Sequence, residues 1–318
     1  HMYANSDGKV YKIDLNSGNQ KEVSSGYSLM GLDDQRLYLK DNTRVKATTK
    51  EGESLWTFDP PGEVRDMNLG SNGRMYFKTS DTFDELYLYS IEPSQDPNHE
   101  GVVWRDSTSG STWSNYETVL DKDNNFCFSV YKGWGNYGEI GCIDSEGEKK
   151  WSVNSKKYEG SRGLITSGNT LYYTSLVKTG SGMLYANPGV QSDILSNSSF
   201  DNIRYTPEVD LPPRGITTNG KLLIYGKREG EWKLFKEKDN IEDMRSFASP
   251  DTDNAVDMVI DSNNIVYLLG GGELIAINVD NGAIKWRISV NNSADSLILG
   301  PQGRLYFGVN NEGIYVVE

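Results

Sequence analysis

Apart from carboxylates, the side chains that most often carry out catalysis are scarce in this chain. Its 318 residues include two histidines, His1 and His99. A Ser-His-Asp triad or a histidine-based metal site needs histidine side chains. His1 and Met2 resemble a cloning remnant, which leaves only His99 for such a role. We therefore predict no catalytic residue, no metal site and no cofactor.

The acidic residues fall mostly in turns. Asp33 and Asp34, residues 121–125 (DKDNN) and residues 261–264 (DSNN) each follow a short apolar segment. The 121–125 run alternates oxygen-bearing side chains as a calcium loop does, but it lacks the glycine and the distant glutamate of an EF-hand. We interpret these side chains as acceptors of backbone hydrogen bonds. An enzyme with two carboxylates about 5–10 Å apart in a central channel stays the alternative.

The order of elements in residues 257–288 recurs along the chain. It reads as an apolar strand, a polar turn, a tyrosine-bearing strand, a short turn, a third strand, and a fourth strand with a tryptophan. Such short strands with tight Gly, Asn or Asp turns favour antiparallel meanders. The first strand and its turn occur seven times, in segments 28–36, 66–74, 117–125, 163–169, 215–221, 257–264 and 296–304.

Four tryptophans mark the fourth strands. The spacing Gly-x-x-x-Trp occurs in GESLW, GEKKW and GAIKW. Glycine allows the positive φ of a tight turn, and the ring four residues later can pack on the neighbouring blade. We predict this inter-blade structural role for Trp56, Trp104, Trp151 and Trp286.

These repeats predict an all-β fold, a β-propeller that forms a single domain over residues 1–318. The expected architecture is seven four-stranded blades closed by the N- and C-terminal strands, with Lys9–Val23 paired to Gly313–Val317. The N-terminal segment resembles a second, a third and a fourth strand together, which is more than closure requires. Eight blades, two of them incomplete, are therefore the alternative.

The repeat resembles the pyrroloquinoline-quinone-like (PQQ-like) propeller family. The resemblance rests on residues 273–286 (ELIAINVDNGAIKW), 138–151 (GEIGCIDSEGEKKW) and 8–18 (GKVYKIDLNSG). It implies either a quinoprotein dehydrogenase or a non-catalytic relative, such as the propeller lipoprotein of the outer-membrane β-barrel assembly machine. Quinoproteins of this family are longer and carry adjacent cysteines beside the quinone, whereas Cys127 and Cys142 are fifteen residues apart. The resemblance therefore favours the non-catalytic branch.

The two cysteines lie on the predicted second and third strands of one blade. A disulfide between these strands is geometrically allowed. Two free, half-buried thiols are equally compatible with the sequence, so both alternatives stay open.

Aromatic residues beside glycines and serines indicate a binding face. Loops between second and third strands lie at the same end of a meander as the blade-to-blade connections. The connection 105–116 carries Trp113 and Tyr116, and the next such loop carries Tyr131, Trp134 and Tyr137. We predict that these five residues bind a protein, a peptide or a neutral glycan. Packing back on the blade edge is the alternative, and the repeat-breaking segment 187–214 reaches the same face.

The formal charge of −13 disfavours nucleic acid and anionic membranes as partners. No run of eighteen apolar residues is present, so we expect no membrane span. The Asn-, Ser- and Tyr-rich composition favours an exported protein. We expect it at the cell surface or in the periplasm, as a monomer with a lipid anchor upstream. A structural module of a larger surface protein is the remaining alternative.

Overall fold

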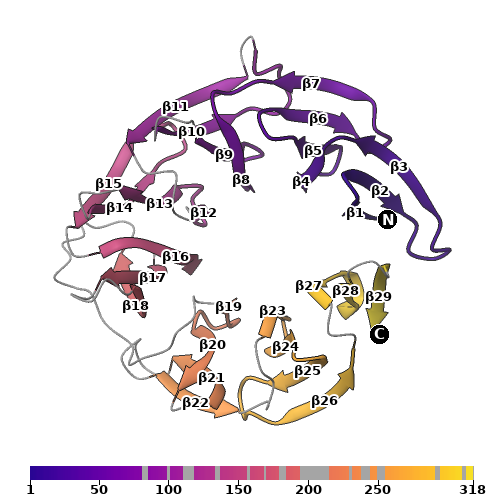
Figure 1. Ribbon diagram of the computed structural model, residues 1–318, viewed down its shortest axis with the longest axis vertical. Coiled ribbons are helices and arrows are strands. Elements are labelled where there is room, and N and C mark those ends of the chain that lie inside the picture. Colours follow the sequence, from indigo (N-terminus) through magenta and orange to yellow (C-terminus); the bar gives the residue numbers. More distant parts are fainter. Residues whose placement is uncertain are drawn as a thin grey trace. The chain divides into compact units, whose positions relative to one another are not determined.

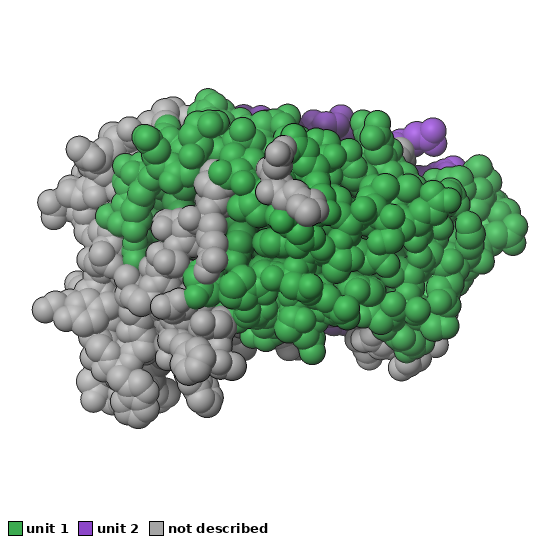
Figure 2. Space-filling model, turned by 90° about the horizontal axis from the view of Figure 1, so that it is seen from above, with its two compact units in different colours: residues 1–160 green, residues 161–318 purple. Residues whose placement is uncertain are grey.

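A computed structural model describes most of the chain as β-strands. The described residues are 1–80, 85–98, 101–109, 118–132, 137–155, 158–167, 170–178, 184–193, 215–228, 231–237, 244–248, 255–290, 294–309 and 313–317. They belong to two compact units, residues 1–160 and 161–318, coloured green and purple in Figure 2.

Four antiparallel sheets follow one another in the first unit (Figure 1). The first has three strands, β1 (Met2–Ser6), β2 (Lys9–Ile13) and β3 (Gln20–Ser25). The second has β4 (Ser28–Leu32), β5 (Arg36–Lys40), β6 (Val45–Thr49) and β7 (Ser54–Phe58). The third has β8 (Glu63–Leu69), β9 (Met75–Ser80), β10 (Glu85–Ile91) and β11 (Val102–Ser109). The fourth has β12 (Thr118–Leu120), β13 (Phe126–Lys132), β14 (Tyr137–Ile143) and β15 (Lys149–Ser155).

Four further sheets follow, and all but the start of the first lie in the second unit. They begin with β16 (Tyr158–Ser167), β17 (Thr170–Lys178) and β18 (Leu184–Asp193). The next has β19 (Gly215–Ile216), β20 (Leu222–Arg228), β21 (Glu231–Glu237) and β22 (Met244–Ala248). Then come β23 (Ala255–Ile260), β24 (Ile265–Gly270), β25 (Glu273–Asn278) and β26 (Ile284–Ser289). The last has β27 (Ala294–Leu299), β28 (Leu305–Val309) and β29 (Gly313–Val317).

Each sheet is a meander whose consecutive strands pair, which is the construction of a propeller blade. Within each unit the first strands of neighbouring sheets lie side by side, as β4 does with β8 and β23 with β27. The described residues contain no α-helix, only a 3-10 turn at Pro301–Gly303. The predicted all-β propeller class is confirmed.

Neighbouring sheets bury their facing sides against each other. Leu37, Tyr38 and Leu39 on β5 are all fully buried, because one side of the strand packs on the first sheet and the other on the third. In the second unit one cluster joins β20 and β21 to β23–β25, and another joins β24 and β25 to β27 and β28. Strands covered on both sides read as continuous apolar runs, which is why their sequences show little alternation.

The four tryptophans occupy one equivalent position. Each pairs with the third-strand residue just before a register shift, in the pairs Ala47–Trp56, Ser90–Trp104, Cys142–Trp151 and Ala276–Trp286. A bulge there bends the fourth strand and increases its twist. The shared register confirms the repeat alignment.

One of these rings makes a direct hydrogen bond to the neighbouring blade. The Trp56 indole is buried and donates a hydrogen bond from Nε1 to the Pro93 carbonyl of the third sheet, at 3.1 Å. Trp286 packs against the cluster that joins β24 and β25 of its own sheet to β27 and β28 of the last sheet. Trp151 is buried as well. The Trp104 side chain lies outside the described residues.

The terminal strands pair within their own sheets. Lys9–Ile13 and Gln20–Ser25 belong to the first sheet, and Gly313–Val317 pairs with Leu305–Val309. The two-residue turn Asp7-Gly8 has positive φ at both positions and folds β1 directly onto β2. The predicted closure would join the two units, and it stays a prediction.

The first sheet is an incomplete blade. Its β2–β3 turn has the Asp14 N–H to Asn19 carbonyl and Gly18 N–H to Asp14 carbonyl bonds, and the β25–β26 turn repeats them at Asn278. β1, β2 and β3 therefore correspond to second, third and fourth strands. Seven sheets begin with the predicted first strands and this one does not, so the described strands form eight sheets, as in the eight-bladed alternative.

Candidate functional site

Of the five predicted binding residues, only Tyr131 and Tyr137 are among the described residues, at one end of the fourth sheet. Trp113, Tyr116 and Trp134 lie outside the described residues. Tyr131 and Tyr137 are described by their backbones at the ends of β13 and β14, where Tyr131 pairs with Gly138 and Lys132 pairs with Tyr137. The two tyrosines therefore flank one loop, and their clustering with the other three stays a prediction.

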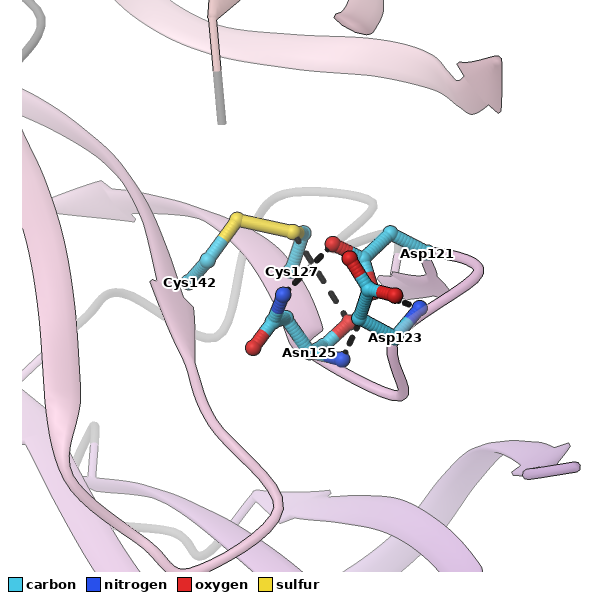
Figure 3. Close-up of a disulfide and its surroundings, with 5 residues drawn as sticks. All are labelled: Asp121, Asp123, Asn125, Cys127 and Cys142. Atoms are coloured by element: carbon cyan, nitrogen blue, oxygen red, sulfur yellow. Dashed lines mark hydrogen bonds between the residues drawn. A yellow bond between two sulfur atoms is a disulfide. The ribbon is translucent and has the colours of Figure 1, made fainter. Parts of the chain in front are cut away.

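The turns between first and second strands confirm that their acidic side chains hold the backbone. Asp121 Oδ1 accepts the N–H groups of Asp123 and Asn125, and its Oδ2 accepts the Asn125 side-chain amide at 2.6 Å (Figure 3). Asp261 accepts the N–H groups of Asn263 and Ile265 in the same way. The interpretation of residues 121–125 as a turn is therefore correct.

These turns also hold the tyrosines of the second strands and join neighbouring sheets. The Tyr38 hydroxyl donates to Asp33 Oδ2 at 2.6 Å, and burial together with this bond raises the pKa of Tyr38. Asn124, which has a positive φ, accepts a hydrogen bond from the Ser71 hydroxyl of the preceding sheet. Thr218 makes the corresponding bonds to Asn264. This end of each unit is consequently built for rigidity.

Cys127 and Cys142 form a disulfide between opposed residues of β13 and β14, so the first of the two open alternatives holds (Figure 3). Both cysteines are fully buried. In the second sheet the equivalent positions hold Tyr38 on the second strand and Ala47 on the third, and Ala47 pairs in turn with Trp56 on the fourth. The disulfide thus ties together the base of the β13–β14 hairpin, whose sequence contains three of the predicted binding residues, Tyr131, Trp134 and Tyr137.

The described part of the loop face contains an aromatic ring beside two cations. Tyr27 lies in the connection from β3 to β4, and Arg44 and Lys46 come from the β5–β6 turn and β6. The Lys46 ammonium lies 5.2 Å from the centre of the Tyr27 ring, and the Arg44 guanidinium carbon lies 5.5 Å from it. We call Tyr27, Lys40, Arg44 and Lys46 the basic–aromatic surface.

Packing and hydrogen bonds hold most of this surface in place. Tyr27 packs against the core cluster of β2, β3 and β5, so its ring has one anchored side. Lys40 Nζ donates to the Val64 and Arg65 carbonyls at 3.0 and 3.3 Å. Such contacts reduce the side-chain entropy that a ligand would otherwise have to freeze.

The charges on this surface are not equally available. Arg44 Nε donates to Asp41 Oδ2 at 2.6 Å. Burial raises the pKa of Asp41, but hydrogen bonds from the Arg44 side chain and from the N–H groups of Thr43 and Arg44 outweigh it and hold the pKa below its usual value. Among the described residues Lys46 has no hydrogen bond or ion pair. Its ammonium can therefore donate to a ligand while staying over the Tyr27 ring.

Sequence reasoning missed Tyr27, Arg44 and Lys46. The signal was present in the repeat, because residues 26–27 are a blade-to-blade connection and residues 41–44 are a second-to-third-strand loop. These residues were missed because the strands of the first sheet were assigned to closure of the ring. Residues 26–27 were therefore not considered as a connection between two blades.

Two further observations limit the chemistry of the described residues. They contain no group of three or more His, Cys, Asp or Glu side chains that could hold a metal ion. No helix in them is long and apolar enough to cross a membrane.

No family model and no curated protein matches this sequence. Solved structures do match. BamB from Moraxella catarrhalis is 13% identical with a TM-score of 0.57, over 99% of this chain and 95% of that one. The Dos1 propeller is 13% identical with a TM-score of 0.60, over 96% and 80%. Kuenenia stuttgartiensis hydrazine synthase is 11% identical with a TM-score of 0.54, over 98% and 89%. At such identities the likeness shows the fold alone, and that fold is the β-propeller.

Proposed function

We propose that this protein is a non-catalytic, exported scaffold of the PQQ-like propeller type, and that its loop face binds a protein or peptide. The observation that carries the proposal is Lys46, whose ammonium has no protein partner among the described residues and lies over the anchored Tyr27 ring. An aromatic ring beside an available donor suits a peptide, whose carbonyls accept hydrogen bonds and whose side chains cover the ring.

The charges support this choice of ligand. The formal charge of −13 acts at long range and is screened beyond roughly 8 Å at physiological ionic strength. A ligand in contact with Tyr27 instead meets Lys46 and Arg44. Peptide carbonyls and single carboxylates fit this surface, and a neutral glycan that stacks on Tyr27 is the second candidate.

Two observations support export and a binding role. Disulfides such as Cys127–Cys142 persist mainly in oxidising compartments, which include the periplasm and the cell surface. The second observation concerns the carboxylates that the enzyme alternative requires. On β8, the first strand of its sheet, Glu63 is ion-paired with Arg65 at 2.8 Å and Asp66 with Lys78 at 2.7 Å. These two carboxylates therefore already have structural partners.

The test begins with a screen of a displayed peptide library and a neutral-glycan array against the 318-residue protein. The affinity of each ligand is then measured with Tyr27→Ala, Lys46→Ala and Trp134→Ala. We expect each substitution to weaken binding by about 2 kcal/mol or more, as at an interface hot spot, and to leave folding intact.

Tyr11→Ala is the matched control, because Tyr11 is a tyrosine of similar partial exposure on strand β2. Unchanged affinity in all three loop-face variants would contradict the proposal. So would equal weakening by the control.

A further inference from the structure

One position of the repeat carries a charge in the second sheet and a buried packing residue in two other sheets. Lys46 comes one position before the third-strand residue that pairs with the blade tryptophan. In the third and seventh sheets the same position holds Tyr89 and Ile275, which are 1% and 0% exposed. Lys46 is partly exposed. Because burying an ammonium costs free energy, the packing of the repeat gives no reason for a lysine here.

Hydrogen bonds fix the ring over which this ammonium lies. The Gly26 N–H donates to the Gly8 carbonyl at 2.8 Å, which ties the β3–β4 connection to the β1–β2 turn. The Asn5 side chain holds the other end of the connection, because it accepts the Leu29 N–H at 2.7 Å and donates to the Leu29 carbonyl at 3.3 Å. Tyr27 is therefore in place before a ligand binds, which lowers the entropy cost of association.

The two cations beside Tyr27 differ in how their charge is balanced. A hydrogen bond to Asp41 and the charge of that carboxylate raise the pKa of Arg44, with smaller contributions from Tyr27 and Asp59. Lys46 makes no hydrogen bond and no ion pair with the part of the chain that the structure describes. Lys46 therefore carries a positive charge that no described carboxylate contacts.

We infer that Lys46 selects a partner peptide with an aspartate or glutamate side chain, whose carboxylate accepts a hydrogen bond from the lysine ammonium. This inference rests on the proposed function and specifies the ligand of the basic–aromatic surface. A hydrogen bond between an ammonium and a carboxylate is about twice as strong as one between neutral groups, so an acidic side chain gains more here than a peptide carbonyl. The ammonium has three donors, and it can bind the carboxylate while it stays over the Tyr27 ring.

A doubly charged phosphate fits this surface less well than a carboxylate. Arginine binds phosphate best through two parallel N–H donors. Arg44 already donates from Nε to Asp41 Oδ2, and its Nη2 is ion-paired with the same oxygen. The carboxylates of Asp41 and Asp59 also repel a second negative charge more than a single one. A neutral glycan offers no charge to Lys46, so a charge-neutralising change at this residue would leave its affinity unchanged.

The test compares two displayed libraries of otherwise random short peptides, one with glutamate at the central position and one with glutamine. Both are panned against the 318-residue protein. We expect the glutamate library to yield binders whose affinity falls by about fivefold or more when the central glutamate is replaced by glutamine, which is the upper range for an exposed ion pair. The preference should shrink as salt is added, because salt screens exposed charges.

Variants of the protein assign this preference to one side chain. In Lys46→Gln the glutamate and glutamine forms of each peptide should bind within about twofold of each other, because both changes remove the same contact. Lys46→Arg keeps the charge and should keep the preference. Lys9→Gln is the matched control, since it removes the same charge where the chain enters β2, but Lys9 is already ion-paired with Glu22 at 2.7 Å. This control should leave the preference unchanged.

The outcomes separate this inference from the proposed function. Peptides that require Tyr27 for binding, but bind equally well with glutamate and with glutamine, would overturn the inference alone. A glutamate preference that persists in Lys46→Gln, or that Lys9→Gln abolishes equally, would do the same. If neither library yields a saturable binder, the inference and the proposed peptide-binding function are both overturned.

Discussion

Replacement of Trp56 tests how the blades are held together. Trp56 is 7% exposed, and its ring centroid lies 6.4 Å from that of Tyr38. Truncating a large buried aromatic to alanine costs about 3–5 kcal/mol. The change also removes the donor to the Pro93 carbonyl, and an unsatisfied buried acceptor costs about 1–3 kcal/mol. We therefore expect Trp56→Ala to lower the free energy of unfolding by about 4–5 kcal/mol.

Two variants separate these contributions. Trp56→Phe keeps an aromatic ring near Tyr38 but removes the N–H donor, so it should cost about 1–3 kcal/mol. Trp286→Ala should cost less than Trp56→Ala, because Trp286 is only partly buried. Equilibrium urea unfolding followed by far-UV circular dichroism measures all three. The reasoning fails if Trp56→Ala costs no more than Trp286→Ala.

Three further predictions concern the disulfide, the buried tyrosine and the glycine of a turn. Replacing both Cys127 and Cys142 by alanine opens a loop of fifteen residues and should lower the free energy of unfolding by about 3 kcal/mol in urea titrations, whereas less than about 1 would contradict a structural role. The folded-state pKa of Tyr38 lies above the ordinary value of 10.0, so its contribution to stability is present below pH 10 and is lost as the pH rises. The urea midpoint of the protein should therefore fall more steeply above about pH 10 than that of Tyr38→Phe, and equal slopes would refute this. A Cβ on Gly70 would lie 2.4 Å from Asn72 Oδ1 and 2.7 Å from Asn124 Oδ1, so Gly70→Ala should lower the melting temperature, whereas Gly73→Ala meets no atom and tests only backbone strain at positive φ.

The sequence was sufficient for the fold class because the repeat is carried by chemistry that recurs. Trp56, Trp151 and Trp286 follow their glycines at a fixed spacing, and the structure pairs each with the equivalent third-strand position, beside the same register shift. Asp121 and Asp261 could be recognised as turn residues because aspartate followed by asparagine two to four positions later favours side-chain-to-backbone hydrogen bonds.

The remaining features depend on contacts that no local pattern encodes. Closure by the terminal strands was predicted from the need to cover edges, whereas the place of β1–β3 as a sheet of their own depends on the Asp7-Gly8 turn that pairs β1 with β2. The approach of Lys46 to Tyr27 joins a residue of β6 to a residue of the β3–β4 connection nineteen positions earlier, and neither residue is unusual by itself. The disulfide could be proposed from strand positions, but its formation required the register in which Cys127 is opposite Cys142.

The central claim is that the loop face binds a ligand and does not transform it. The most direct measurement incubates the ligand selected in the screen with a stoichiometric amount of protein and follows it by mass spectrometry. The account predicts that the ligand is recovered unchanged, and that Tyr27→Ala and Trp134→Ala release it. A converted product whose formation is abolished by replacing one aspartate or glutamate would contradict the account and establish an enzyme.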